Sequence, residues 1–202
     1  MKYSLILATT KNGAIGNKND LVIHCKEDMK RFRSVTNGKA IIMGRKTYDS
    51  LPHFLPNRMH VIVTRNESLL NNNRHVREEF ANGDFNSSPF IYVKTLEEAC
   101  QVIEKYSNYF GWEYNDQEAV VIGGATMYNE AIESELVDTI YHTVFDYEVT
   151  EADTFVTASP LFTNDKNTET LNEVDCYVFE KDKTIKMNVN FVEYKRKWQS
   201  VT

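Results

Sequence analysis

The sequence predicts an α/β fold with a mixed, mostly parallel sheet and helices on both faces. Over the first two thirds of the chain, short apolar and β-branched runs alternate with helical patterns, which is typical of parallel sheets. Near the C-terminus, the runs Cys176–Lys181 and Asn188–Tyr194 follow each other without a helix between them. Only Asp182-Lys183-Thr184 joins them, so we expect an antiparallel hairpin at one side of the sheet. The other strands are expected at Leu5–Ala8, Ala40–Met43, His60–Thr64, Phe90–Val93, Ala119–Ile122 and Thr139–Phe145.

The composition is that of a globular chain, and it disfavours two classes of partner. The 202 residues are enough to bury one core, and we expect a single domain spanning residues 1–202. Hydrophobic residues make up 42% of the chain, and its formal net charge is -6. That charge disfavours broad electrostatic binding to nucleic acid or to an anionic membrane surface. We expect a monomer that binds small molecules.

The cysteines and the first residues indicate a cytoplasmic protein without a metal centre. Cys25, Cys100 and Cys176 are odd in number and widely spaced, and the sequence has no paired Cys or His ligand motif. We therefore expect reduced thiols; a catalytic thiol at Cys25 remains an alternative. The apolar stretch at residues 3–9 is too short for a membrane span and lacks a signal-peptide cleavage pattern. The mature chain is expected to begin at Met1.

The segment Ala40–Thr47 predicts a place to hold phosphate. Its apolar run is bounded by Gly44, and a helix-favouring stretch follows Arg45 and Lys46. The start of such a helix presents free backbone N–H groups to an anion, and the two cations add charge beside them. The alternative interpretation is an ordinary turn with solvated charges.

A second β-branched run, Ala119–Ile122, also stops at glycines and leads into a helical pattern. Open α/β sheets bind ligands beyond the carboxyl ends of their strands, so two such turns indicate a ligand lying across those ends. Gly123 and Gly124 lack the Cβ atoms that would keep a cofactor away from the backbone. Because Gly-Gly-Ala-Thr is not the Gly-x-Gly-x-x-Gly fingerprint, the motif does not support a Rossmann dinucleotide fold.

A predicted helix from Lys26 to the stop signal at Asn37-Gly38 carries a candidate catalytic acid. Met29, Phe32 and Val35 form its apolar stripe, and Asp28 lies four residues before Phe32 on the same face. A first-turn acid that stabilises the helix dipole is the alternative role for Asp28. In an apolar cleft, burial would instead raise the pKa of Asp28, which could pair with an amidine-like ring.

Three further segments are interpreted from composition and spacing. The loop from Leu51 to Arg58 contains two prolines and ends at an arginine, whose planar fork could bind a substrate carboxylate. Residues 66–89 and 157–173 are polar and show no sustained apolar period, so we expect surface loops there.

Together these segments resemble dihydrofolate reductase over nearly the full chain, from Tyr3 to about Arg196. The order and spacing of the motifs are specific, although each short motif is weak alone. The motifs are Ile15-Gly16, Asp28 with Phe32, Ile42-Met-Gly-Arg-x-Thr47, Leu55-Pro-x-Arg58, Val121-Ile-Gly-Gly124 and Asp153-Thr154-Phe155.

The resemblance implies an eight-stranded sheet, mostly parallel with an antiparallel C-terminal strand, that binds NADPH and 7,8-dihydrofolate. In that family, hydride passes from nicotinamide C4 to pterin C6 while N5 gains a proton. Asp28 matches the acid that hydrogen-bonds the pterin 2-amino group and N3, and it would orient and polarise the ring. Thr143 would hydrogen-bond Asp28, and Arg58 would bind the glutamate α-carboxylate. The positions that match the lining of the substrate pocket are Ile6, Ala8, Met29, Phe32, Leu51, Leu55 and Ile122.

The resemblance also implies a set of cofactor-binding positions. Ile15 and Gly16 match the mobile loop, Ala8 matches a position shared with the substrate pocket, and Gly123-Gly124 would form a cis peptide. The pyrophosphate and ribose side matches Gly44, Arg45, Lys46 and Thr47. The nicotinamide side matches Gly123, Gly124, Ala125, Thr126, Met127 and Tyr128. The surroundings of the 2′-phosphate match Arg45, Thr64, Arg65 and Lys94.

One segment departs from the family pattern. Leu21-Val22-Ile23-His24 stands where the family usually has Leu-Pro-Trp before the acidic helix. We expect this change to affect turnover more than binding. Two alternatives follow: a riboflavin-pathway reductase of the same fold, and a folate-binding or structural protein with reduced turnover. The spacing of Asp28 to Phe32 and the motif ending at Arg58 favour folate.

Overall fold

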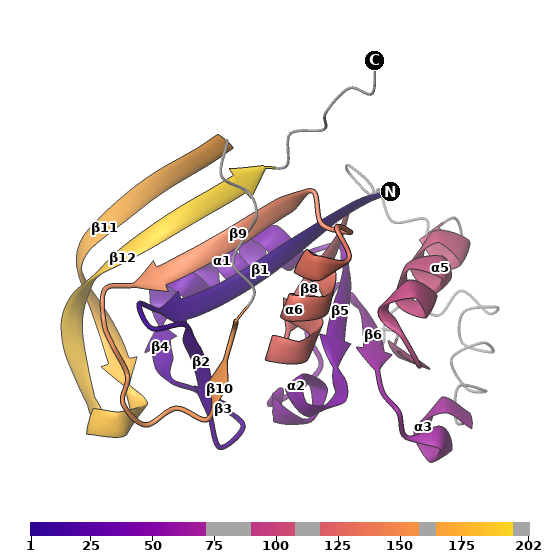
Figure 1. The fold of residues 1–202 in the computed structure, drawn as a ribbon, viewed down its shortest axis with the longest axis horizontal. Coiled ribbons are helices and arrows are strands. Elements are labelled where there is room, and N and C mark those ends of the chain that lie inside the picture. The colour runs from indigo at the N-terminus through magenta and orange to yellow at the C-terminus, as the bar shows by residue number, and fades with distance from the viewer. Residues whose placement is uncertain (72–89, 108–117, 158–164, 196–202) are drawn as a thin grey trace.

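The computed structural model of the protein describes residues 1–71, 90–107, 118–157 and 165–195 (Figure 1). The strands of its main sheet are β1 (Lys2–Thr10), β4 (Ile23–Cys25), β5 (Ala40–Gly44), β6 (Met59–Val63), β7 (Phe90–Val93), β8 (Glu118–Gly123), β9 (Thr139–Phe145), β11 (Asp165–Val178) and β12 (Lys183–Lys195). A small sheet contains β2 (Ala14–Asn17), β3 (Asp20–Leu21) and β10 (Thr154–Phe155). The helices are α1 (Lys26–Thr36), α2 (Arg45–Ser50), α3 (Glu67–Asn71), α5 (Leu96–Ser107), α6 (Ala125–Glu133) and the 3-10 turn η1 (Phe179–Lys181).

The main sheet runs in the order β4-β11-β12-β9-β1-β8-β5-β6-β7. Every pairing from β9 across to β7 is parallel, and the β9-β12, β12-β11 and β11-β4 pairings are antiparallel. The C-terminal half therefore adds a long hairpin to one side of a parallel sheet, as predicted. Figure 1 shows this hairpin, β11 and β12, curving away from the rest of the sheet.

The predicted strand count of eight was wrong, because the sheet formed by the described residues has nine strands. The additional edge strand is β4, which pairs Ile23, His24 and Cys25 with Val178, Tyr177 and Cys176 of β11. Ile23 and His24 lie in the segment that departs from the family pattern. A three-residue strand is too short to give a periodic signal, and it forms only because β11 supplies hydrogen-bonding partners far along the chain.

Two predicted loops and one strand end also differ. β11 begins at Asp165, so residues 165–173 form a strand where a loop was expected. Eight of these nine residues are polar or charged, which suits a part of the strand that β4 leaves as an edge exposed to water. Phe179–Lys181 form the 3-10 turn of the hairpin rather than its strand. Within the expected loop at 66–89, residues 67–71 form α3, and 72–89 lie outside the described residues.

Alternating residues of the central strands pack on opposite faces of the sheet, and each face has its own helices. Ala40 and Ile42 of β5 join a cluster that contains residues of α5 and α6, such as Ala99 and Ala131. Ile41 of the same strand packs on the other face, with Phe32 and Val35 of α1. Figure 1 shows α1 behind β1 and β9, and α6 in front of the sheet. The prediction of helices on both faces is confirmed.

Two kinds of feature are absent from the described residues. Their helices include none that is both long and apolar enough to cross a membrane. Within the same residues, no three His, Cys, Asp or Glu side chains are grouped so as to hold a metal ion.

Candidate active site

Asp28 is buried near the start of α1, with only 7% of its surface exposed. The helix begins after the extended residue Cys25, and Glu27 and Asp28 are acids in its first turn. It ends at Asn37, whose N–H donates to the carbonyl of Arg33 at 3.0 Å. An acid whose only role was to favour the helix dipole would be stabilised equally well at the surface. The burial of Asp28 therefore indicates a further role.

Burial raises the pKa of the Asp28 carboxyl, because the charged form loses hydration. Two groups oppose this effect: a hydrogen bond with the Thr143 side chain and the nearby charge of Arg31 both lower the pKa. Thr143 is fully buried on β9. The predicted contact between Asp28 and Thr143 therefore offsets part of the effect of burial on this carboxyl.

Five of the seven predicted pocket positions come together in one apolar cluster, although they lie up to 116 residues apart in sequence. Ile6 of β1 and Ile122 of β8 are buried in it. The half-buried side chains Phe32, Leu51 and Leu55 pack against the same cluster. Ala8 packs against a neighbouring cluster that includes Ile23, and Met29 is half-buried on α1. The residues singled out on four separate segments therefore share one region next to Asp28.

Arg58 is held in place rather than free at the surface. Only 4% of the surface of Arg58 is exposed. Its Nε donates to Thr36 Oγ1 at 2.9 Å, Nη1 donates to the Pro56 carbonyl at 2.6 Å, and Nη2 reaches the Arg33 carbonyl at 3.5 Å. Burial, together with the charge of Arg33, lowers the pKa of Arg58. The predicted rigid loop does fix this guanidinium, and it fixes it against the end of α1.

The two glycine turns meet at adjacent strand ends. Met43 of β5 lies opposite Gly123 of β8 in the parallel register. Gly123-Gly124 is a cis peptide, as predicted. A Cβ on Gly124 would lie 3.2 Å from Thr47 Oγ1, and one on Gly44 would lie 3.6 Å from Met127 Cγ and 4.0 Å from Gly124 N. The turns therefore pack backbone to backbone, and a side chain at Gly124 would displace its neighbours.

The helices that follow these turns leave their first N–H groups available. Gly44 and Gly124 are the N-caps of α2 and α6, and neither provides a side-chain cap. Neither first turn contains an acidic residue, whereas α1 has two. Uncapped N–H groups with no acid in the same turn are suited to an anionic ligand. On α6, Ala125 is half-buried and Thr126 is exposed.

Tyr128 has a structural part in the site that the sequence did not reveal. Its hydroxyl lies 2.9 Å from the carbonyl oxygen of Ile6 and 2.7 Å from that of Ile122. Burial raises the pKa of Tyr128, and the charge of Asp28 raises it further. The hydroxyl of this neutral tyrosine therefore links the middle of β1 to the C-terminal end of β8, two strands that line the pocket.

The predicted phosphate-binding cations lie at the surface. Arg45 forms an ion pair with Asp49 one turn along α2, and Lys94 Nζ lies 3.6 Å from Glu67. Arg65 and Lys46 are exposed, whereas Thr64 is buried and accepts from the Asn66 N–H at 3.2 Å. Exposed cations with acidic partners are available to an anion, since a surface ion pair contributes little energy.

Val22 and Ile23, which stand where the family usually has Pro-Trp before α1, are packed into the core. Val22 and Ile23 are each 4% exposed and belong to a cluster with Cys176 and Val178 of β11. The Phe179 N–H donates to the Val22 carbonyl at 3.1 Å. Farther back, the half-buried Ile15 packs against the core, and Gly16 pairs with Thr154 and Leu21 in the small sheet. The pair Val22-Ile23 is therefore anchored to the C-terminal hairpin.

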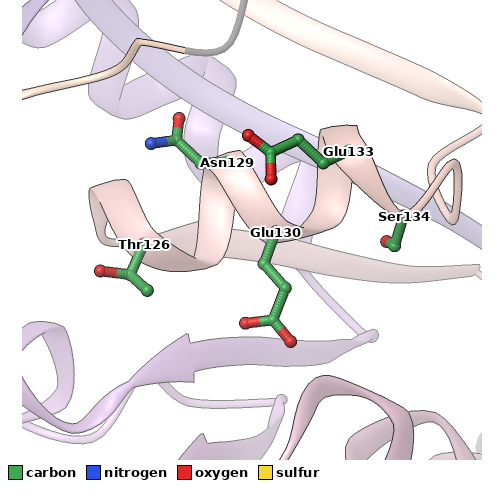
Figure 2. Close-up of a pocket in the computed structure, with 5 residues that line it drawn as sticks. All are labelled: Thr126, Asn129, Glu130, Glu133 and Ser134. Atoms are coloured by element: carbon green, nitrogen blue, oxygen red, sulfur yellow. The ribbon is translucent and has the colours of Figure 1, made fainter.

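One surface depression lies elsewhere. It has a volume of about 570 Å³ and is lined by Thr126, Asn129, Glu130 and Glu133 of α6 and by Ser134, the residue that caps this helix (Figure 2). It lacks cations among these residues and has two carboxylates, which oppose an anionic ligand. Of the predicted site residues, only Thr126 lines it. It does not fit the predicted cofactor.

Sequence comparison identifies the family. A family model described as dihydrofolate reductase matches residues 2–84. A dihydrofolate reductase of Aedes albopictus is 33% identical over 164 residues, which cover 76% of this chain and 78% of that protein. This chain belongs to the dihydrofolate reductase family.

Two further relatives show how far the similarity extends. Dihydrofolate reductase type 9 of Escherichia coli is 47% identical over 62 residues, 31% of this chain, and the match spans about a third (35%) of that protein. A solved structure, dihydrofolate reductase from Enterococcus faecalis complexed with NADP(H) and RAB-propyl, superposes with a TM-score of 0.63. That pair is 21% identical, and the match covers 97% of each chain. The dihydrofolate reductase fold is thus shared over almost the whole length.

Proposed function

We propose that this protein reduces 7,8-dihydrofolate to 5,6,7,8-tetrahydrofolate with NADPH as the hydride donor. The observation that carries the proposal is Asp28: a buried carboxyl hydrogen-bonded to Thr143, in the apolar region where Ile6, Phe32 and Ile122 meet. Membership of the dihydrofolate reductase family supports it.

The substrate side of the site has the groups that a pterin with an acidic tail requires. A carboxylate accepts from two neighbouring N–H groups of one ring, so Asp28 can hold the pterin 2-amino group and N3. The half-buried Phe32, Leu51 and Leu55 offer apolar surface to the pterin and aminobenzoate rings. Arg58 would bind the α-carboxylate of the tail with the donors that its own contacts leave free.

The turns at Gly44 and Gly124 fit NADPH. Their close backbone approach and the uncapped starts of α2 and α6 provide N–H donors for the pyrophosphate. Thr47 and Lys46 would lie on the ribose and phosphate side, and Arg45, Arg65 and Lys94 on the side of the 2′-phosphate. When bound, NADPH supplies a hydride at nicotinamide C4. Gly16 and Ile15 would contact the nicotinamide from the small sheet.

Within this reaction Asp28 orients and polarises the pterin and does not reach N5. The proton that N5 gains would come through water, with the ionised Asp28 raising the basicity of the ring. The surrounding apolar side chains limit access of water and strengthen the effect of the carboxylate charge.

A riboflavin-pathway reductase of the same fold, and a binding protein with little turnover, are the alternatives. Steady-state oxidation of NADPH with dihydrofolate, compared with equilibrium binding of each ligand, separates the three. Dihydrofolate-dependent oxidation supports the proposal. Tight binding of both ligands without oxidation would support the binding protein, and oxidation only with a ribosylated pyrimidine would support the riboflavin-pathway enzyme.

We also propose a single-domain monomer that acts in the cytoplasm on small molecules alone. One cooperative thermal transition and a light-scattering mass equal to one chain would agree with this. Two separate transitions, or a mass of two chains at micromolar concentration, would contradict it.

A further inference from the structure

Arg31 is a partly buried cation that the substrate and cofactor sites described above leave unassigned. It lies on α1, three residues after Asp28, so both side chains are on the same face of the helix. Its Nη1 donates to the His142 carbonyl at 3.0 Å and to Thr143 Oγ1 at 3.3 Å. Its Nη2 donates to the Val192 carbonyl at 3.3 Å. Because His142 and Val192 lie opposite each other in the β9-β12 register, one guanidinium spans the seam between these strands.

Two aromatic rings complete the position of this guanidinium. Its central carbon lies 4.7 Å from the ring centroid of Phe191 and 5.8 Å from that of Tyr141. Stacked rings and backbone acceptors hold a planar guanidinium in one orientation, which a flexible ammonium group would not match. Arg31 is therefore fixed next to the hydroxyl that Asp28 uses.

The Thr143 hydroxyl contacts both Arg31 and Asp28 but has only one hydrogen. The group to which it donates this hydrogen affects the charge of Asp28. When Thr143 Oγ1 accepts from Arg31, its own hydrogen is free to point at Asp28. A hydroxyl that donates to Asp28 stabilises the ionised carboxylate, whereas one that accepts from it would stabilise the protonated acid. The contact with Arg31 therefore selects the orientation that favours the charge.

We propose that Arg31 is a positioning residue for the reaction: it orients the Thr143 hydroxyl toward Asp28 and, by its charge, keeps that carboxylate ionised at neutral pH. The proposal rests on the proposed function, since it assumes that the ionised Asp28 binds the pterin. It assigns no contact between Arg31 and substrate.

The other charged and titratable groups around Asp28 do not provide this stabilisation. Tyr128 of α6 and Cys176 of β11 interact with Asp28, and burial contributes to raising the pKa of both, so both are neutral at pH 7. The Cys25 thiol, just before α1, interacts with the Asp28 backbone. Arg31 itself faces Asp28, Glu193, Tyr141 and Glu169, and burial lowers its pKa without removing its charge.

The direct test is the carboxyl carbon NMR titration of Asp28 in the ligand-free protein. Arg31→Met should move the titration midpoint up by about one pH unit, as expected for loss of an opposite charge at short range. Arg31→Gln should give a somewhat smaller shift, since it loses the charge but its amide can still donate to Thr143, and Arg31→Lys, which keeps the charge without the planar contact, should shift the midpoint less than half as far as Arg31→Met. Lys30→Met, which removes an exposed cation one residue away on the same helix, is the matched control and should not shift the midpoint.

A second readout is the pH dependence of dihydrofolate affinity. As the pH is lowered, dihydrofolate affinity should begin to fall at a higher pH in Arg31→Met than in wild type, because Asp28 then takes up its proton earlier. NADPH affinity should stay within about two-fold. A double-mutant cycle of Arg31→Met with Thr143→Val should be non-additive in the titration midpoint, because both act on one hydroxyl.

Unchanged midpoints in both Arg31→Met and Arg31→Gln, with only a lower thermal transition, would overturn the proposal and leave Arg31 as a tether between α1 and the sheet. If Arg31→Met fails to fold, Arg31→Gln and Arg31→Lys decide between charge and tether. Wild type that fails to bind dihydrofolate would refute the proposed function, and the ligand-free titration would still decide the role of Arg31.

Discussion

The substrate side and the cofactor side of this protein hold their charged groups in opposite ways. Asp28 and Arg58 are buried, and each is fixed by hydrogen bonds to residues of other elements. Arg45, Arg65 and Lys94 are exposed, and two of them form surface ion pairs with nearby acids. The groups that would act on the reacting ring are thus set by folding. The cations that would recognise a phosphate lie at the ends of flexible, exposed side chains, so folding fixes their positions less strongly.

This difference has energetic consequences. A buried carboxylate keeps its charge only because neighbours compensate for the lost hydration, so removing one partner changes its behaviour strongly. An exposed guanidinium gains about 0–1 kcal/mol from a surface ion pair and exchanges partners easily. We therefore expect large effects on chemistry from the buried side, and moderate, salt-sensitive effects on affinity from the exposed side.

The largest effect is expected for Asp28→Asn. The variant should fold and bind NADPH but reduce dihydrofolate at least ~100-fold more slowly near pH 7, because polarisation of the pterin is lost. Glu27→Gln, which neutralises the neighbouring acid in the same helical turn, should stay within about three-fold of wild type. Steady-state kinetics measure both. Equal losses in the two variants would mean that helix charge, not Asp28, is responsible.

Arg58→Lys should raise the KM for dihydrofolate about 10- to 100-fold, with little change in kcat. Lysine keeps the charge but cannot provide the planar fork or replace the contacts to Thr36 and Pro56. Its control is Arg33→Lys, an exposed position on α1 whose side chain has no assigned part in the site. An unchanged KM in the Arg58 variant would show that the substrate tail binds elsewhere.

Replacing Arg45 and Arg65 together by Ala should reduce the preference for NADPH over NADH by about tenfold or more, since charge-assisted hydrogen bonds to the 2′-phosphate are lost. Salt should weaken NADPH binding more than NADH binding in wild type, and less so in the double variant. Lys186→Ala, on the distant hairpin, removes an exposed cation as a control. Full discrimination in the double variant would place the recognition of the phosphate elsewhere.

Asp28→Asn should also raise stability at neutral pH. Because burial raises the pKa of Asp28, the folded state binds this proton more tightly than the unfolded chain does. The unfolding free energy of wild type then falls as pH rises from the ordinary aspartate range through the raised pKa, and stays lower above it. The variant lacks this loss, so its thermal midpoint should exceed that of wild type at pH 7 and converge with it at acidic pH.

The smallest effect is expected for Asp49→Ala. Loss of the ion-pair partner frees Arg45 and removes a negative charge near the expected phosphate, so NADPH should bind about two-fold more tightly. NADH affinity should not change. A gain for both dinucleotides alike would mean that Asp49 acts on the shared pyrophosphate.

The same contrast explains what the sequence could predict. Local patterns found the strands around Ile6, Ile42 and Ile122, the helix carrying Asp28, and both glycine turns, because periodicity and turn residues are local signals. Contacts between residues far apart in the sequence could not be predicted from such local signals. The link from Arg31 to Val192 and the hydroxyl of Tyr128 between Ile6 and Ile122 depend on the assembled sheet.

The segment Val22-Ile23 shows this limit most directly. The sequence showed a departure from the family's Pro-Trp and predicted a deficit in turnover. The structure shows both side chains buried against Cys176 and Val178 of a hairpin about 150 residues away. A tryptophan at position 23 would have to displace these neighbours, at about 1–3 kcal/mol for an overpacked site. No local pattern could indicate that this short stretch would become an edge strand.

Single-turnover hydride transfer, with both ligands saturating and pH as the variable, tests the central role of Asp28 most directly. In wild type we expect fast transfer at pH 7. In Asp28→Asn we expect transfer at least ~100-fold slower at pH 7 that recovers partly toward acidic pH, because solvent can then protonate N5 without help from the carboxylate. Transfer within a few-fold of wild type at pH 7, or a slow rate that does not change with pH, would contradict this role.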